Sequence, residues 1–232
     1  MIKSYSFNVP VISVGNLNAG GTGKTPMVEF LIDYFSEHYK VGVLSRGYKR
    51  KSKGFILASE KDDAKSIGDE PFQYFSKFKN IKVAVDTKRK RGITNLINYG
   101  VNMILLDDAF QHRKVIPTYS ILLTDYSNLY FNDYLMPRGT LRESKKGSIR
   151  ADSIIITKCP SNISDVDRFA IKKLVKPTPK QNIFFSSIKY SKELFSLNNS
   201  INISKLNGKQ VNLVTGIANS KPLIKFLKNS GL

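Results

Sequence analysis

The chain has 232 residues, a formal net charge of +19 and a single cysteine, Cys159, which excludes an internal disulfide. No apolar run approaches the roughly 18–20 residues that cross a bilayer, so we predict a soluble or peripheral protein. The positive charge attracts polyanions such as an anionic membrane surface, but the chain has no basic recognition helix or aromatic-interleaved basic strand, and no nucleic acid is predicted as a partner.

Short apolar runs alternate with helical stretches, which is typical of a parallel sheet with crossover helices. The expected strands are residues 11–14, 41–44, 81–85, 103–106, 121–124, 153–157, 183–186 and 210–214. Several are continuous Val, Ile and Leu runs, which favours strands buried on both faces. We therefore predict an α/β fold with a mainly parallel sheet flanked by helices.

Two helices stand out. The first carries Pro26 in its first turn, and its expected core face consists of Met27, Phe30, Leu31, Tyr34 and Phe35. The second is expected to begin near Asp69, Glu70 and Pro71, with Phe72 and Phe75 on its apolar face.

The domain organisation follows from where this pattern weakens, which is after Pro160. We expect residues 1–160 to form a nucleotide-binding core of the P-loop type. Residues 161–232 are expected to begin a second, incomplete α/β half. The segments at 49–54 and 135–147 are expected to be loops, the second of them long enough to suggest a functional role.

The strongest motif follows the first expected strand and precedes the Pro26 helix. It consists of Gly20, Gly21, Thr22, Gly23, Lys24 and Thr25. Glycines let the backbone amides converge on phosphate oxygens, and the helix N-terminus adds a positive dipole. Lys24 would reach the β- and γ-phosphates of a nucleoside triphosphate, and the Thr25 hydroxyl would ligate Mg²⁺. One position departs from the strict pattern, because Asn18 stands where the first glycine is expected.

The second motif is the apolar strand at 103–106, which ends in Asp107 and Asp108. A carboxylate at this place holds Mg²⁺ directly or through water in phosphate-loop proteins. Two adjacent carboxylates repel each other, and a divalent ion would relieve that repulsion. Sequence alone does not decide which of the two contacts the ion.

Several further segments occur in a specific order along the chain. They are Val14–Leu17 with Gly20–Pro26, Leu44–Tyr48, Gly68–Pro71, Asp107–His112, Leu135–Glu143 and Thr157–Cys159. Together they closely resemble the tetraacyldisaccharide 4′-kinase family of Gram-negative bacteria. The resemblance extends from about Val9 to about Gly216.

The resemblance implies an ATP- and Mg²⁺-dependent kinase of lipid A biosynthesis that phosphorylates the 4′-hydroxyl of a tetraacylated disaccharide 1-phosphate. It implies a peripheral location at the cytoplasmic face of the bacterial inner membrane. It gives Asp69 the role of base, places phosphate binding at Gly20–Thr25 and the magnesium side at Asp107 and Asp108. It also places Arg46, His112, Arg142 and Glu143 in the active-site cleft.

From the residues alone, the interpretation of Asp69 as a helix N-cap is favoured over that of a base, whereas His112 is equally interpretable as a structural histidine and as a site residue. Compared with the family, the chain lacks an amphipathic N-terminal segment and a second half that carries a supporting histidine. We expect this difference to impair full activity but not nucleotide binding. The alternatives are a P-loop regulatory NTPase, suggested by Thr157 and Lys158, and a nucleic-acid-binding ATPase, suggested only by charge.

Overall fold

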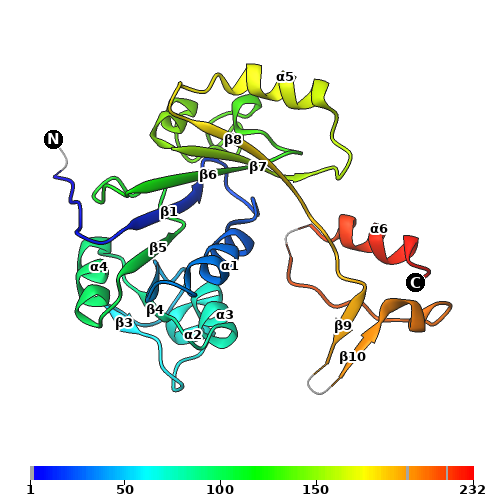
Figure 1. Ribbon diagram of the computed structural model, residues 1–232, viewed down its shortest axis with the longest axis horizontal. Helices are drawn as coiled ribbons and strands as arrows, with labels where there is room; N and C mark the ends of the chain where they lie inside the picture. The colour runs from blue at the N-terminus through cyan, green and yellow to red at the C-terminus, as the bar shows by residue number, and fades with distance from the viewer. Residues whose placement is uncertain (1–2, 197–198, 218) are drawn as a thin grey trace. The chain divides into compact units, whose positions relative to one another are not determined.

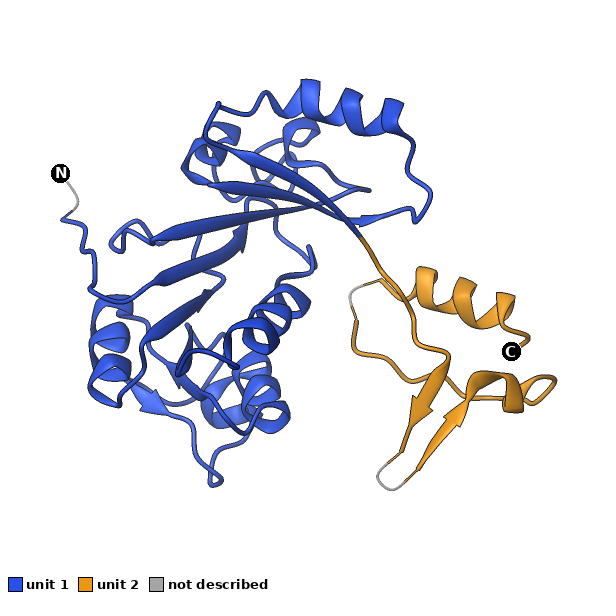
Figure 2. Cartoon of the chain, in the orientation of Figure 1, with its two compact units in different colours: residues 1–186 blue, residues 187–232 orange. Residues whose placement is uncertain are grey.

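The computed structural model describes residues 3–196, 199–217 and 219–232 (Figure 1). The chain divides into two compact units, residues 1–186 and residues 187–232 (Figure 2).

The first unit is built on an eight-stranded sheet with the order β3-β4-β2-β5-β1-β6-β7-β8. The strands are β1 (Val11–Asn16), β2 (Val41–Ser45), β3 (Ile56–Leu57), β4 (Lys82–Val85), β5 (Met103–Asp107), β6 (Tyr119–Asp125), β7 (Ser153–Cys159) and β8 (Asn182–Ser187). The pairs from β4 across to β7 are parallel, and the short β3 runs antiparallel to β4. The predicted mainly parallel sheet is therefore confirmed. All seven strands expected before residue 200 are present, and β3 was missed because two residues carry no periodicity.

Helices cover both faces of this sheet. They are α1 (Lys24–Phe35), α2 (Ala64–Ile67), α3 (Asp69–Lys77), α4 (Arg89–Asn98) and α5 (Asp165–Val175), with 3₁₀ turns η1 (Tyr130–Asn132) and η2 (Lys145–Arg150). Side chains of α1 and α3 pack with Val43 and Leu105 on one face, whereas α4 packs with Leu44 and Ile104 on the other (Figure 1). Successive strand residues point to opposite faces, which is why neighbouring apolar residues serve two cores.

The core face of α1 differs from the prediction. Val28, Leu31 and Ile32 are its buried residues, whereas Phe30 and Tyr34 are 61% and 65% exposed. The helix carries two overlapping apolar stripes offset by one position, and both satisfy helical spacing. The contact with the sheet selects one of them, and the sequence does not show which.

The boundary between the units also differs from the predicted one. Helix α5 and strand β8 follow residue 160, yet β8 joins the large sheet and Ile171 of α5 is buried in its core. The division therefore falls after residue 186 rather than after residue 160. The apolar pattern weakened there because β8 lies at the edge of the sheet, where several of its side chains remain exposed.

The second unit contains a hairpin of β9 (Glu193–Phe195) and β10 (Ser200–Asn202), the turn η3 (Ile203–Leu206) and helix α6 (Lys221–Asn229). The expected strand at 210–214 is wrong, because these residues form no strand and Val214 is 94% exposed. An apolar run becomes a strand only when a partner strand satisfies its backbone groups. Within the part of the chain that the structure describes, no helix is both long and apolar enough to cross a membrane.

Candidate active site

The glycine-rich loop joins β1 to α1 in a curled conformation. Gly20 has φ 121° and Gly23 has φ 87°, values that side-chain-bearing residues rarely adopt. The buried Asn16 amide donates to the Thr22 hydroxyl at 2.9 Å and to the Gly20 carbonyl at 3.4 Å, and so holds the loop from inside. Gly23 is the N-cap of α1 and offers no side chain to cap it. The first amides of α1 are therefore available to an anion.

Asn18, the departure from the strict motif, has a structural role. It is buried, and its amide donates to the Asp133 carboxylate at 2.9 Å. The neighbouring Ala19 amide donates to the Thr140 carbonyl at 2.7 Å. These bonds tie the phosphate loop to the loop at 133–142, a contact that a glycine at position 18 could not make through a side chain.

The expected lysine, aspartate and arginine meet at the carboxyl ends of the strands. The Lys24 ammonium lies 3.7 Å from an Asp108 carboxylate oxygen and 3.5 Å from the Asn16 side-chain oxygen. Arg142 donates to both Asp108 oxygens, at 2.8 and 3.0 Å, and also to the side chain of Asn16. Burial alone would raise the pKa of Asp108, but the Arg142 hydrogen bonds and the Lys24 charge outweigh it and hold that pKa below its ordinary value.

Asp107 lies deeper than Asp108. Parallel pairing sets it opposite Val14 of β1, and it is 2% exposed. Burial, followed by the charges of Glu70 and Asp108, raises its pKa to about 7. Glu70 responds similarly: burial and then the charges of Asp108 and Asp69 raise its pKa, against the opposing effect of Lys24. Glu70 is thus an acid of this site that the sequence analysis assigned only to a helix start.

The structure places three of the remaining expected residues around this centre without direct hydrogen bonds to it. Asp69 is the exposed first residue of α3, and Gly68 is the N-cap, so the interpretation of Asp69 as the cap itself is wrong. Arg46 follows β2 and is exposed, and its charge acts on His112 and on the buried Arg89. Burial and then the charges of Arg89, Lys114 and Arg46 lower the pKa of His112, which favours a neutral imidazole.

Glu143 belongs to a neighbouring network rather than to the Asp108 cluster. It accepts from Arg150 at 2.7 Å and from Arg113 at 3.3 Å. Arg150 also donates to the Phe110 carbonyl, and the Gln111 amide donates to the Asn16 carbonyl at 2.7 Å. This network fixes the segment that follows Asp108 against β1.

Two residues at the end of β7 also hold the phosphate loop. The Thr157 hydroxyl donates to the Thr22 carbonyl at 2.8 Å, and the Lys158 ammonium bonds to the Gly21 carbonyl and, at 2.7 Å, to Asp125. From the sequence, Thr157 and Lys158 were part of the resemblance to the family and the basis of the regulatory NTPase alternative, and no contact with the phosphate loop was predicted for them. Cys159, next to them, is buried.

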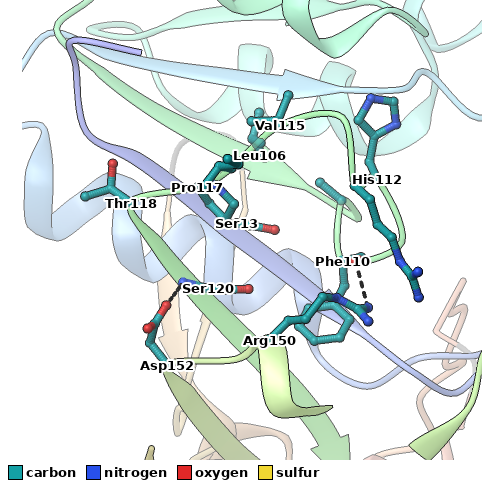
Figure 3. A pocket seen from close by; sticks show the side chains of 13 residues that line it. Ser13, Leu106, Phe110, His112, Val115, Pro117, Thr118, Ser120, Arg150 and Asp152 are labelled. Atoms are coloured by element: carbon teal, nitrogen blue, oxygen red, sulfur yellow. Dashed lines mark hydrogen bonds between the residues drawn. The ribbon is translucent and has the colours of Figure 1, made fainter. Parts of the chain in front are cut away.

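A cavity of about 400 Å³ lies beside the segment at 109–118 (Figure 3). His112, Arg150 and Asp152 line it, and Asp152 accepts from the Ser120 amide at 2.8 Å. The arginines that line this cavity, Arg113 and Arg150, are both paired with Glu143. The two arginines thus share one carboxylate. Among the residues that the structure describes, no group of three His, Cys, Asp or Glu side chains is arranged to hold a metal ion unaided.

Comparisons with known proteins agree on one family. The family model described as LpxK, tetraacyldisaccharide-1-P 4′-kinase, matches residues 1–232. A tetraacyldisaccharide 4′-kinase of Flavobacterium johnsoniae is 47% identical over 231 residues, which cover 99% of this chain and 68% of that protein. One from Bacteroides thetaiotaomicron is 46% identical over 240 residues, which cover 98% of this chain and 63% of that protein.

Among solved structures, the LpxK of Aquifex aeolicus in complex with ATP is similar, with a TM-score of 0.61 and 29% sequence identity. The match covers 84% of this chain and 77% of that one. The family model, which matches residues 1–232, extends across the phosphate loop and the paired aspartates.

Proposed function

The chain belongs to the tetraacyldisaccharide 4′-kinase family of lipid A biosynthesis, and on this premise we propose how its residues transfer the γ-phosphoryl group of ATP to the 4′-hydroxyl of a tetraacyldisaccharide 1-phosphate. The family membership replaces both sequence-based alternatives, the regulatory NTPase and the nucleic-acid-binding ATPase. The observation that carries the proposal is the meeting of three features at one edge of the sheet: the uncapped α1 N-terminus, the Lys24 ammonium and the Asp107–Asp108 pair.

ATP would bind along Gly20–Thr25. The curled loop and the free amides of α1 suit its phosphates, and the ATP complex of the Aquifex aeolicus relative supports this assignment. Asn16, Thr157 and Lys158 act as positioning residues, because each holds a backbone carbonyl or hydroxyl of the loop in place. Preorganisation of this kind spares the nucleotide complex the free energy of ordering the loop.

Magnesium would be held by Thr25, Asp107 and Asp108, with the phosphates and water completing its shell. The donor set fits, because carboxylate and hydroxyl oxygens are the hard ligands that Mg²⁺ prefers. One of the carboxylates, that of Asp107, is buried, and its pKa is raised by burial and by neighbouring acids. Because Arg142 already engages both Asp108 oxygens, we assign the closer contact to Asp107. The ion would neutralise charge on the transferred phosphoryl group.

The chemical step forms a bond from the 4′-oxygen to the γ-phosphorus and breaks the bond from that phosphorus to the β,γ-bridging oxygen. We assign the hydroxyl proton to Asp69, whose carboxylate is exposed and free of the capping role. Lys24 and Arg142 stabilise negative charge that develops on the phosphoryl oxygens. Arg46 and neutral His112 would bind and orient the acceptor, and Glu143 positions the segment that carries Asp108 and His112.

We also propose that the protein works as a peripheral protein at the cytoplasmic face of the inner membrane. Its lipid substrate resides in a membrane, and a net charge of +19 favours contact with anionic lipid.

The chemistry is tested by Asp69→Asn, with Asp63→Asn as a matched control. Asp63 is a true N-cap on the neighbouring helix α2, where its carboxylate accepts from the Ser66 amide at 2.7 Å. Asparagine caps about as well as aspartate, so the control should keep wild-type turnover. Asp69→Asn should lower kcat for phosphate transfer to the lipid by at least about 10²-fold, in the range of lost acid–base catalysis, with an almost unchanged KM for ATP.

Equal turnover in the two variants would refute the role of Asp69 as base. A matching loss of ATP affinity would instead place Asp69 at the magnesium ion. Transfer of phosphate to the disaccharide by the wild type, followed with radiolabelled ATP, is the reference for both.

A further inference from the structure

Tyr74, in the middle of α3, carries a hydroxyl that the fold does not use. Its side chain is fully buried in the core shared by α1, α3 and the sheet, in the same cluster as Val28 and Leu105. Among the residues that the structure describes, no group forms a hydrogen bond with this hydroxyl. A buried hydroxyl without a partner destabilises a protein, and a phenylalanine would fill the same core without that cost. The unused oxygen therefore indicates a role outside the packing of the free protein.

The hydroxyl of Tyr74 lies at the proposed magnesium side. Burial, followed by the charge of Asp107, raises the pKa of Tyr74, and the nearby Thr25 hydroxyl acts in the opposite direction. The Tyr74 and Thr25 hydroxyls therefore lie close together, although their geometry falls short of a hydrogen bond. Glu70 and Glu29 add further negative charge around the phenol. All four surrounding side chains present oxygens that accept hydrogen bonds, so the protonated phenol can act as a donor to them.

The packing of α3 against α1 brings Tyr74 and Thr25 together. Side chains of a helix lean toward its N-terminus, so Tyr74 reaches back toward the first turn of α3, where the acids of this helix lie. Glu29 of α1 accepts from Gln73 at 2.8 Å and from Lys77 at 2.7 Å, which holds the two helices together. Thr25 lies one turn before Glu29, in the first turn of α1.

A threonine that ligates Mg²⁺ leaves part of its hydroxyl oxygen unused. The oxygen has two lone pairs, and when one of them is directed at the ion, the other can accept a hydrogen bond. Threonine in a helix also divides between two side-chain rotamers, so a donor fixed on one side selects between them. The Tyr74 phenol is suited to this task, because the core holds its ring in place and a neutral group adds no charge beside the ion.

We propose that Tyr74 is a positioning residue for magnesium binding: its hydroxyl donates to the Thr25 hydroxyl oxygen and selects the Thr25 rotamer that ligates the ion. This inference rests on the proposed function, which assigns Thr25 to the ion. The hydrogen bond is completed when the nucleotide and Mg²⁺ bind. Tyr74 contacts neither of them and acts through Thr25.

The test removes single oxygen atoms. Tyr74→Phe deletes the hydroxyl and keeps the ring. Tyr130→Phe is the matched control, because Tyr130 is also buried and its hydroxyl also lacks a hydrogen-bond partner in the described part of the chain, but it belongs to a different core cluster. Each protein is titrated calorimetrically with a non-hydrolysable ATP analogue, once with Mg²⁺ and once with EDTA. Its melting temperature is measured without ligand.

We expect Tyr74→Phe to reduce the gain in affinity that Mg²⁺ confers by about three- to tenfold, the effect of one lost hydrogen bond. Its affinity in EDTA should stay within about twofold of wild type, as should both affinities of the control. Neither variant should melt below the wild type, because each loses an unpaired buried hydroxyl. An unchanged effect of Mg²⁺ would overturn the proposal. So would a lower melting temperature with equal weakening in EDTA and in Mg²⁺, since a purely structural tyrosine behaves in this way.

A double variant tests whether the effect passes through Thr25. In a Thr25→Ala background, Tyr74→Phe should change the affinity in Mg²⁺ by less than about twofold, because its partner is absent. A full additional loss would show that Tyr74 acts on another group and would refute the proposal. Wild-type binding that does not depend on Mg²⁺ would refute it together with the magnesium site. Phosphate transfer to the lipid disaccharide is measured separately, and its absence would refute the lipid kinase step while the titrations still decide the role of Tyr74.

Discussion

Arg142→Lys isolates the hydrogen-bonding geometry at the centre of the site from its charge. Arg142 bonds to both oxygens of Asp108, at 2.8 and 3.0 Å, and reaches the Asn16 carbonyl at 3.3 Å. Lysine keeps the positive charge but cannot form the fork, so Asp108 loses one of its two bonds and the Asn16 carbonyl loses its contact.

The magnitude follows from the number of bonds and their exposure. Hydrogen bonds to charged groups contribute about 1.5–3 kcal/mol when buried. The side chains of Arg142 and Asp108 are 26% and 38% exposed, so we take a reduced total of about 1.5–2 kcal/mol. This corresponds to a loss of about 10- to 30-fold in kcat/KM.

The assay measures kcat/KM for the lipid substrate at saturating ATP, together with the melting temperature. Arg168→Lys is the control, because Arg168 forms an exposed pair with Asp165 at 3.9 Å, far looser than the Arg142 fork. The control should be indistinguishable from wild type. Arg142→Lys activity within about twofold of wild type would show that the fork does not position Asp108 for transfer.

Three further predictions follow from the structure. Lys24→Ala should lower ATP-dependent turnover by about 10²–10³-fold with an unchanged melting temperature, and preserved turnover would refute the phosphate-loop assignment. Burial favours a higher pKa for Asp86, but the hydrogen bonds and charge of Arg91 and the hydrogen bond from the Lys88 amide outweigh burial and hold this pKa below its ordinary value. The Asp86 carboxylate therefore stabilises the fold above about pH 4, and this stabilisation is lost as the pH falls through the lowered pKa. Asp86→Asn should therefore lower the free energy of unfolding at pH 7 and flatten its acid dependence in urea titrations, and an unchanged acid limb would contradict this. In co-sedimentation assays, the protein should bind anionic vesicles at low salt and lose most of this binding near about 0.5 M salt, where the Debye length is only a few Å. Co-sedimentation that persists at the higher salt would reveal an apolar anchor instead.

Much of the fold could be predicted because its signals are local. The strands β1, β2, β4, β5, β6 and β7 are continuous apolar runs, and burial on both faces of a parallel sheet requires that composition. The phosphate loop was identified because its glycines lie between a buried strand and a helix. Gly20 and Gly23 have positive φ angles, which residues other than glycine rarely adopt, so the loop conformation leaves its mark on the sequence. The signal failed at 210–214, where a segment with three apolar residues, Val211, Leu213 and Val214, forms no strand.

The arrangement of the site depended on tertiary structure. Nothing in the sequence links Asn18 to Asp133, or Arg142 to Asp108, because the chain separates the members of each pair by more than 30 residues. The resemblance to the family placed Glu143 in the cleft together with Arg142, but it did not show that Glu143 pairs with Arg113 and Arg150 while Arg142 pairs with Asp108. Adjacent residues in a loop can face opposite networks, and only the surrounding contacts decide between them.

By itself, then, the sequence determined the elements that local chemistry specifies: the buried strands, the start of α1 at the phosphate loop, and the acids at the end of β5. Tertiary structure alone decided which stripe of α1 meets the sheet, that Asp69 follows rather than forms a helix cap, and that Arg142 pairs with Asp108. The physical reason is the range of the forces involved. Backbone conformation and strand burial are encoded within a few neighbouring residues, whereas charge clusters form only where the folded chain brings distant segments together.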